Sequence, residues 1–269
     1  NITFGAGNDD ISGNDGNDTF TIGAGNDTVT GGSGNDRVSV ALANLDSNDS
    51  ISLGGDSRDT LSYTNVTALN SSGINSTQKA ALDGQSGINV IGSSATDVTA
   101  IDANFFSQTV FELTGSTLSK DFAISDVAGD RLILANTLQA GTADGVSITG
   151  DGPGNSGTLE LSGSSSVVVA GNDSGGTDAG LVVGSGMSSL DIVSTTTASS
   201  TSGLTNGIDA DDDAALDSVG GTANFAVDNS GASSMTLSGD VDFTVTQGQT
   251  AGFSNAVNFD AGSFTGDLT

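Results

Sequence analysis

The sequence predicts an all-β fold in which a parallel β-roll is followed by β-solenoid or β-sandwich segments. Two observations carry this prediction: a nine-residue repeat in the first part of the chain and a composition poor in helix formers. Of the 269 residues, 40 are Gly, 39 are Ser and 31 are Thr, and these residues favour turns and strands over helix. Because only 35% of the residues are hydrophobic, a thin solenoid core is expected rather than a thick globular one.

Residues 1–62 hold the repeat. The triplet Gly-Asn-Asp recurs every nine residues, at 7–9, 16–18, 25–27 and 34–36. An apolar residue stands two positions after each Asp: Ile11, Phe20, Val29 and Val38. Two positions before each triplet stand Gly5, Asn14, Gly23 and Gly32. Six residues rich in Gly are expected to turn the chain, and about three alternating residues to form a strand whose apolar member points inward. A flexible linker would share this composition but not the phase of the apolar residues.

The stretches 23–30 and 31–39 resemble the RTX nonapeptide family, whose pattern is G-G-x-G-x-D-x-U-x. The first family glycine is kept only at Gly13 and Gly31, and Asn14 replaces the second one once. Asn tolerates left-handed backbone better than most residues, so the fold prediction survives this replacement. The resemblance implies a parallel β-roll with two nonapeptides in each coil, so that the loops of repeats i and i+2 stack on the same side.

The stacked loops are predicted to bind calcium. Stacked strands lie about 4.8 Å apart, and calcium takes oxygen ligands at about 2.3–2.6 Å, whereas magnesium demands a tighter octahedron. We therefore expect Asp9 to pair with Asp27, and Asp18 with Asp36. The family resemblance implies that loop carbonyls complete the shells, here those of Gly5, Gly7, Gly16, Gly23, Gly25, Gly32 and Gly34. The ratio of 31 Asp to 2 Glu favours calcium loops over a merely solvated acidic surface, which would use Glu as readily.

After residue 40 the repeat becomes irregular. The stretches 48–51 and 54–61 look like degenerate repeats displaced by insertions. Asp49 and Asp59 are candidates for further calcium ligands, and the alternative is that they are turn residues of a capping coil, because solenoid ends are usually atypical. Without cations, carboxylates about 5 Å apart repel by roughly 3 kcal/mol per pair at an effective dielectric near 20. The calcium-free segment is therefore expected to be disordered.

The rest of the chain divides into a connector at 63–89 and a Ser/Thr-rich β region at 90–269. The connector has one mildly helical patch, at 77–82. In the β region, 122–134 are expected to form a hairpin with a Gly-Asp turn, and Asp130 is not expected to be a ligand. The acidic run Asp209–Asp213 is not an EF-hand, because the sixth and twelfth positions hold Ala214 and Gly220 instead of Gly and Glu. It is either a solvated acidic turn or an irregular calcium loop.

Composition excludes several classes of function. The net charge of −28 repels the phosphates of nucleic acids. With no His and no Cys, zinc, haem and thiol chemistry are disfavoured and the usual catalytic triads cannot form. No apolar run approaches the ~20 residues of a membrane helix. We therefore expect no enzyme activity, no nucleic-acid partner and no membrane span.

The favoured function is a structural one. The chain resembles a piece of a calcium-dependent bacterial S-layer protein of the RTX type, and neither end looks like a natural terminus. The resemblance implies type I secretion of an unfolded chain, folding in calcium outside the cell, and self-association into a lattice or filament on the cell surface. A cell-surface polysaccharide is a further partner, through regions not present here. Two alternatives stay open: a segment of a large RTX adhesin or extracellular filament, and the folding module of a secreted RTX enzyme or toxin.

Overall fold

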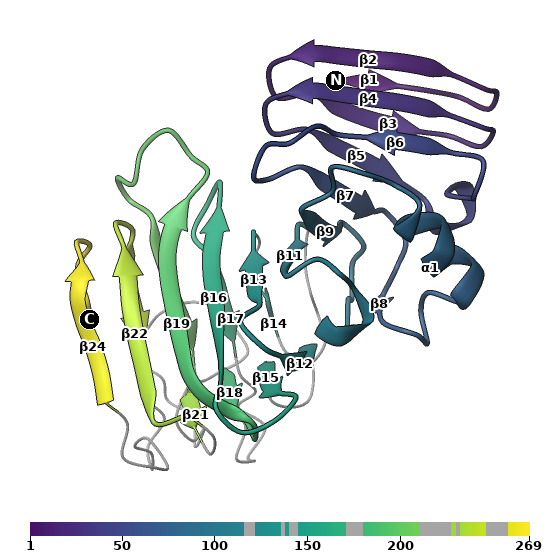
Figure 1. The fold of residues 1–269 in the computed structure, drawn as a ribbon. Helices are drawn as coiled ribbons and strands as arrows, with labels where there is room; N and C mark the ends of the chain where they lie inside the picture. The colour runs from purple at the N-terminus through teal and green to yellow at the C-terminus, as the bar shows by residue number, and fades with distance from the viewer. Residues whose placement is uncertain are drawn as a thin grey trace.

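The chain folds as a β-solenoid whose coils stack from the N-terminus at one end to the C-terminus at the other (Figure 1). The computed structural model describes residues 1–115, 122–135, 138–139, 145–170, 180–209, 227–229, 232–245 and 258–269. Within these ranges every strand pair is parallel, and the predicted all-β parallel fold is confirmed. Because sandwiches are built from antiparallel sheets, parallel pairing after residue 90 identifies a solenoid.

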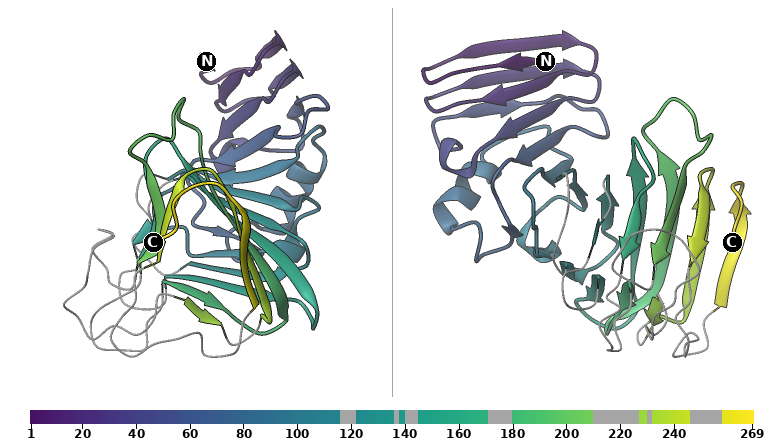
Figure 2. Two further views of the ribbon diagram at one scale, coloured as in Figure 1. Left: turned by 90° about the vertical axis from the view of Figure 1, so that its left-hand side faces the viewer. Right: turned by 180° about the vertical axis from the view of Figure 1, so that it is seen from behind.

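One long sheet runs through the molecule. Its eleven strands among the described residues are, in spatial order, β1 (Ile2–Thr3), β3 (Thr19–Ile22), β5 (Arg37–Val40), β7 (Thr60–Tyr63), β9 (Val90–Ser93), β11 (Val110–Leu113), β13 (Arg131–Leu134), β16 (Asn155–Gly163), β19 (Met187–Thr196), β22 (Ser234–Gly239) and β24 (Asn258–Phe264). Its strands come from the expected segments 1–62 and 90–269, and of the expected connector 63–89 the sheet contains only Tyr63. It changes direction between β7 and β16, so that the first coils and the last coils lie at an angle to each other (Figures 1 and 2).

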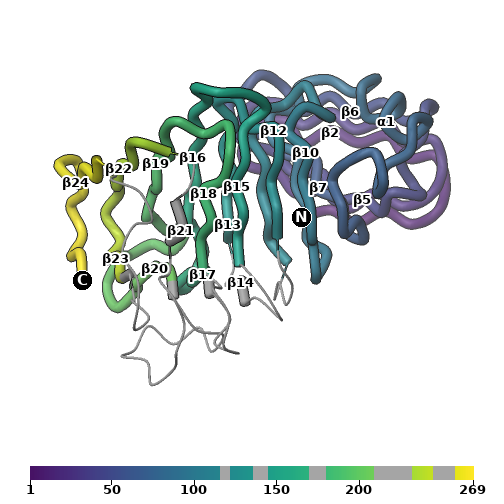
Figure 3. The backbone as a smooth tube through the Cα atoms, turned by 90° about the horizontal axis from the view of Figure 1, so that it is seen from below, coloured from purple at the N-terminus to yellow at the C-terminus, as the bar shows by residue number. Residues whose placement is uncertain are grey.

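Three smaller sheets form the other sides of the coils. In the described part of the chain, the first coils use β2 (Asp10–Asp15), β4 (Thr28–Ser33) and β6 (Ser50–Ser52). Later coils use β8 (Ala68–Leu69), β10 (Ala100–Asp102), β12 (Phe122–Val127), β15 (Val146–Gly150), β18 (Leu181–Val183) and β21 (Val227–Asn229). A third side consists of β14 (Leu138–Gln139), β17 (Val168–Ala170), β20 (Thr205–Asp209) and β23 (Asp242–Val245). The coils therefore change from two strands each to three strands each, beginning with the coil of β12, β13 and β14. Figure 3 shows these coils from below.

The register of the first coils follows the nine-residue period. Phe20 on β3 pairs with Val38 on β5, and Ile11 on β2 pairs with Val29 on β4, so each partner lies 18 residues away. The stacking of repeats i and i+2 is therefore confirmed. Val29 then pairs with Ile51 on β6, and the larger step accommodates a short 3-10 helix at Leu42–Asn44.

A helix stands between β8 and β9, where the sheet of β2, β4 and β6 gives way to the sheet that begins with β8. Helix α1 (Ser76–Asp83) covers the patch that the sequence marked as helical. Asn75 caps it, because its side-chain oxygen accepts hydrogen bonds from the backbone N–H groups of Thr77 and Gln78. After the helix, Ser86 bridges to Ser52 and continues the sheet of β6. No helix among the described residues is long and apolar enough to cross a membrane.

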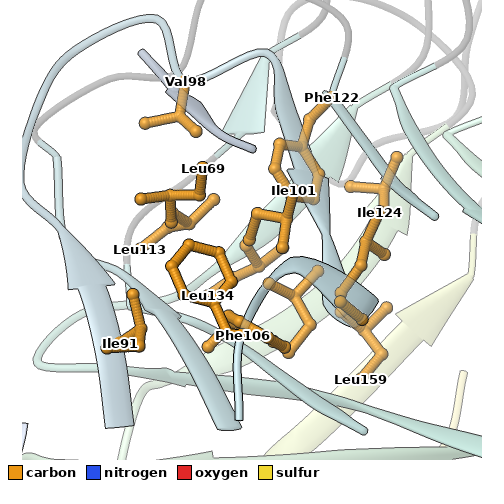
Figure 4. Packing of buried hydrophobic residues seen from close by; sticks show 14 of the residues in the cluster. Leu69, Ile91, Val98, Ile101, Phe106, Leu113, Phe122, Ile124, Leu134 and Leu159 are labelled. Atoms are coloured by element: carbon orange, nitrogen blue, oxygen red, sulfur yellow. The ribbon is translucent and has the colours of Figure 1, made fainter. Parts of the chain in front are cut away.

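The core is a narrow column of apolar side chains between the sides of the coils. Figure 4 shows part of it, where Ile101, Phe122 and Ile124 face Leu113 and Leu134. In the long sheet one inward row runs from strand to strand and is almost fully buried: Phe20, Val38, Leu61, Ile91, Phe111, Leu132, Leu159, Ile192 and Leu237. Each coil thus contributes one residue to this row, which is the structural reason for the phase-locked apolar residues of the repeat.

The prediction of a hairpin at 122–134 is wrong. Strand β12 pairs with β10 and β15, whereas β13 pairs with β11 and β16, so the two strands belong to different sheets. The Gly-Asp turn at Gly129 and Asp130 is a corner of a coil, where Gly129 adopts a φ of 101°. A glycine turn between two apolar strands looks the same in sequence for a hairpin and for a solenoid corner. The acidic run at Asp209–Asp213, apart from the backbone of its first residue, lies outside the described residues.

Candidate metal centre

Aspartates form two ladders, one along each edge of the first coils. Consecutive repeats face opposite edges, so the Asp of every second repeat stacks on the same side. One ladder contains Asp9, Asp27 and Asp49, and the other contains Asp18, Asp36 and Asp59. The expected pairs Asp9 with Asp27 and Asp18 with Asp36 are thus brought together by the strand register.

At each step of a ladder, one oxygen of the later carboxylate accepts the backbone N–H of the preceding ladder residue. The backbone N–H of Asp9 donates to Asp27 Oδ1 at 3.1 Å, and that of Asp18 donates to Asp36 Oδ1 at 2.8 Å. The next step repeats the pattern, with Asp36 N–H donating to Asp59 Oδ1 at 2.9 Å. Because Oδ1 is fixed by the preceding coil, the direction of Oδ2 is fixed as well.

The second oxygen of most of these carboxylates is buried without a hydrogen-bond partner. This is so for four ladder residues: Asp18, Asp27, Asp36 and Asp59. Leaving a buried charged acceptor unsatisfied costs free energy, and a cation is the partner that a carboxylate oxygen lacks here. These orphan oxygens are the observation in the structure that fits a hard, oxygen-binding cation such as calcium.

The electrostatics of the ladders point the same way. Burial raises the pKa of Asp27, Asp36 and Asp59, while the hydrogen bond from the backbone of the preceding ladder residue lowers it in each case. Neighbouring carboxylates raise these pKa values further, Asp49 and Asp9 acting on Asp27. The folded loops therefore disfavour the charged form of their own aspartates, and a bound cation would reverse this.

The loop glycines allow the coils to stack at contact distance. A Cβ on Gly23 would lie 1.8 Å from the carbonyl oxygen of Gly5, and one on Gly25 would lie 1.9 Å from that of Gly7. The same holds one step along for Gly34, whose Cβ would lie 2.4 Å from the carbonyl oxygen of Gly16. Backbone carbonyls of one loop thus lie directly against the next loop. The carbonyls of Gly5, Gly7 and Gly16 are among the seven that the family resemblance implied as ligands.

Glycine is replaced once in this stack, by Asn14. Asn14 adopts a φ of 70°, in the left-handed region, and a Cβ on Gly32 would lie 1.8 Å from its carbonyl oxygen. The expectation that Asn tolerates this backbone is consistent with the observed conformation. Gly32 itself has a φ of 119°, which a residue with a side chain rarely adopts.

Asp49 and Asp59 occupy different environments, although both extend a ladder. Asp49 Oδ1 accepts the N–H of Asp27 at 2.8 Å, and its Oδ2 accepts the N–H of Asp46 at 2.8 Å. Asp59 uses only Oδ1 in this way, and its Oδ2 is an orphan. Asp59 therefore retains an oxygen for a cation, whereas Asp49 closes its ladder as a turn residue of a capping coil would.

Sequence reasoning missed a further stacking of side chains, formed by the asparagines of the triplets. Asn26 N–H donates to Asn8 Oδ1 at 3.0 Å, and Asn35 N–H donates to Asn17 Oδ1 at 2.9 Å. Their constancy in all four triplets was the signal for this role. Asp56 was also missed: its Oδ2 accepts the N–H of Gly34 at 2.7 Å, and it lies in a degenerate repeat where the pattern gave no guide.

The carboxylate ladder ends after the last coil of the roll. The backbone N–H of Asn89 donates to the carbonyl of Asp59, so an amide side chain takes the next place along this edge. In the described residues no three His, Cys, Asp or Glu side chains converge on one point. A metal ion in these loops would therefore be held by paired carboxylates from stacked coils together with backbone carbonyls.

Comparison with known proteins agrees with this geometry. Residues 5–38 match the RTX calcium-binding nonapeptide repeat, in four copies. No curated protein and no solved structure matches the chain. Residues 5–38, which contain Asp9, Asp18, Asp27 and Asp36, are therefore RTX calcium-binding nonapeptide repeats, and they form a parallel β-roll at the start of a longer β-solenoid.

Proposed function

We propose that this chain is part of a calcium-dependent structural protein of the bacterial cell surface, of the S-layer type. In this proposal, calcium ions bind between the stacked loops outside the cell, drive folding of the roll, and allow the acidic subunits to assemble into a lattice. The observation that carries it is the set of buried carboxylate oxygens without partners in loops that stack at contact distance. A structural role, without catalysis, is part of the proposal.

The proposed ligands are the carboxylates with an orphan oxygen and the carbonyls packed against the next loop. They are Asp18, Asp27, Asp36 and Asp59, with Asp9 at the open end of its ladder, and the packed carbonyls of Gly5, Gly7, Gly16 and Gly32. The family resemblance adds the carbonyls of Gly23, Gly25 and Gly34. Asp49 is proposed to close its ladder instead of binding an ion. When bound, calcium would supply positive charge to these carboxylates, and the chain's own residues would hold it in register with the strands.

If calcium binds only the folded roll and not the unfolded chain, the free energy of calcium binding adds to the free energy of folding. Extracellular calcium modules have dissociation constants of about 10⁻⁴–10⁻³ M, so ~5 mM calcium would stabilise the fold by roughly 1–2 kcal/mol per site. Three sites, one for each pair of proposed ligands in stacked coils, would together contribute roughly 3–6 kcal/mol, which is comparable to the stability of a small domain. The roll would therefore fold in millimolar calcium and unfold in calcium-poor cytosol.

Lattice assembly follows from the same charges. A chain with a net charge of −28 repels its own copies, and divalent ions at the surface lower that repulsion. The parallel solenoid supports a passive building element, because each coil rests only on its neighbours and the long sheet gives one continuous stack.

Negative-stain electron microscopy of the full-length protein tests this function. The protein is imaged in ~5 mM calcium, well above the affinities of extracellular modules, and then in excess chelator. Ordered sheets that dissolve on chelation are the expected result. Dispersed particles in both conditions would overturn the lattice proposal and favour an adhesin segment or the folding module of a secreted enzyme or toxin.

A further inference from the structure

The long charged side chains of this protein gather in one place. The chain has only 5 Lys and Arg residues and 2 Glu. Three of these cations, Arg37, Arg58 and Arg131, and both acids, Glu112 and Glu160, lie on or next to the outward side of the long sheet between β5 and β16. Here the sheet changes direction (Figure 1).

Part of this cluster ties the coils together. Arg37 on β5 forms an ion pair with Glu112 on β11, although β7 and β9 lie between them. The side chains have room to cross because the row of Glu112 contains Gly92 on β9. Further along, Arg131 Nε donates to Glu160 Oε2 at 2.6 Å, and Glu160 is only 2% exposed.

Two guanidinium groups keep unused donors. Arg58 Nη2 lies 3.8 Å from Glu112 Oε1, which is too far for a hydrogen bond, and its side chain is 44% exposed. Arg131 directs Nε and Nη2 at Glu160, yet its side chain is 43% exposed. Because a guanidinium carries five N–H donors, both residues present N–H groups to a ligand.

These donors line a groove built from three adjoining hollows, which we call the arginine groove. The central hollow, of about 230 Å³, is lined by Ser57, Arg58, Val110, Arg131 and Ile133. Arg58 also lines a hollow of about 300 Å³ on one side, with Arg37 and Glu112. Ser57 and Val110 also line a hollow of about 460 Å³ on the other side, with Asn89 and Gln108.

The charge of the arginine groove favours a monoanion. Its three arginines face Glu112 and Glu160, which neutralise two of them, and Asp36, which lines the same hollow as Arg37. Asp56 and Asp59 flank Ser57 and Arg58 in sequence, and their carboxylates interact electrostatically with that of Asp36. Calcium bound at Asp36 and Asp59, as proposed above, would offset these opposing charges. Distant aspartates act weakly here, because salt at physiological strength screens charges beyond about 8 Å. A singly charged carboxylate suits this balance, and guanidinium groups bind carboxylates in a planar, two-point geometry.

The uncharged residues that line the arginine groove indicate which class of ligand bears the carboxylate. Ser57, Asn89 and Gln108 offer hydroxyl and amide groups, while Val110 and Ile133 form an apolar floor. Saccharide rings combine hydroxyl groups with an apolar C–H face. A protein partner would be expected to bury aromatic or large apolar anchors over a broad interface, and the lining of these three hollows contains no aromatic side chain. We propose that the arginine groove binds an acidic saccharide, with its carboxylate between Arg58 and Arg131.

Calorimetric titration with trigalacturonate tests this, with its methyl ester as the uncharged match. The full chain is used in ~5 mM calcium, after circular dichroism has confirmed that it is folded, so that a failure of calcium-driven folding is seen separately. Arg58→Gln is the informative variant, because its loose ion pair makes it dispensable for the fold. Lys79→Gln, on α1, removes the same charge elsewhere.

We expect trigalacturonate to bind the parent chain and the methyl ester to bind far more weakly. Arg58→Gln should weaken binding at least about tenfold, as expected for loss of a charge-assisted hydrogen bond, and Lys79→Gln should leave binding unchanged. No binding to the parent, equal binding of the ester, or equal effects of the two substitutions would each overturn the proposal. Self-association that Arg58→Gln abolishes, without saccharide binding, would also overturn it and assign the groove to a contact between copies.

Discussion

Asp36→Asn should change the stability of the roll in opposite directions with and without calcium. The substitution keeps Oδ1, which accepts the N–H of Asp18, and replaces the orphan Oδ2 with an amide nitrogen. In calcium, the site loses one charged oxygen ligand. Without calcium, the folded roll loses a buried carboxylate whose pKa is raised by burial and by the neighbouring carboxylates of Asp18 and Asp56.

The two effects have estimable sizes. Loss of one site in ~5 mM calcium removes roughly 1–2 kcal/mol from the free energy of unfolding, for dissociation constants of 10⁻⁴–10⁻³ M. Without calcium, a carboxylate one strand spacing of about 4.8 Å from another is repelled by at most roughly 3 kcal/mol at an effective dielectric of 20. Removing that charge should therefore raise the free energy of unfolding of the calcium-free protein by an amount up to this size.

Urea unfolding measures both quantities. Tyr63 is the one tyrosine of a chain without Trp, and it is fully buried in the last coil of the roll, so intrinsic fluorescence reports on this region. Circular dichroism gives the strand content independently. Asp10→Asn is the matched control, because Asp10 is exposed on β2 and the substitution removes the same charge from the same coils.

Two outcomes would refute the reasoning. If Asp36→Asn lowered the free energy of unfolding equally with and without calcium, the orphan oxygen would not be part of a cation site. The same conclusion would follow if Asp10→Asn and Asp36→Asn shifted the calcium dependence of unfolding by the same amount.

Three further predictions use the same loops. Gly23→Ala should destabilise the roll by about 1–3 kcal/mol or more, because its Cβ would lie 1.8 Å from the carbonyl oxygen of Gly5; Gly55→Ala, with no atom within 4 Å of its Cβ, should be nearly neutral in the same urea experiment. Asp59→Asn should weaken calcium binding in a calorimetric titration, because it removes a carboxylate with an orphan oxygen. Asp49→Asn should lower the free energy of unfolding by about 1–3 kcal/mol with or without calcium, because its amide nitrogen would face the N–H of Asp46. Equal calcium affinities for the two variants would contradict the assignment. In calcium-free buffer the roll should gain order as the pH falls from 7 toward 4, because the pKa values of the buried ladder aspartates are raised above 3.8 in the folded roll. The stability that protonation of these carboxylates contributes is present below the unfolded pKa and is lost as the pH rises through the folded pKa. In calcium the trend should reverse, because protons compete with the ion, and circular dichroism at each pH distinguishes the two trends.

The periodic part of the fold could be predicted from the sequence because every position in a repeat meets the same position 18 residues away. The phase of Phe20 and Val38 determined which side chains enter the core, and the spacing of the Asp residues determined which carboxylates pair. When a pattern repeats without insertions, the length of the repeat fixes the register between the strands of stacked coils. The helix at α1 was also visible, since its capping residue and helix formers are adjacent in sequence.

Elsewhere only the tertiary structure decided the outcome. The Gly-Asp turn at Gly129 and Asp130 is compatible with a hairpin or a coil corner, and the choice depends on strands β10 and β15, which are distant in sequence. Asp49 and Asp59 look equivalent in the degenerate repeats, but Asp46 satisfies the second oxygen of only one of them. Arg37 and Glu112 are 75 residues apart and meet because the coils between them stack. Where insertions remove the fixed period, packing between coils decides which strands and side chains become partners. No local pattern in the sequence predicts these partners.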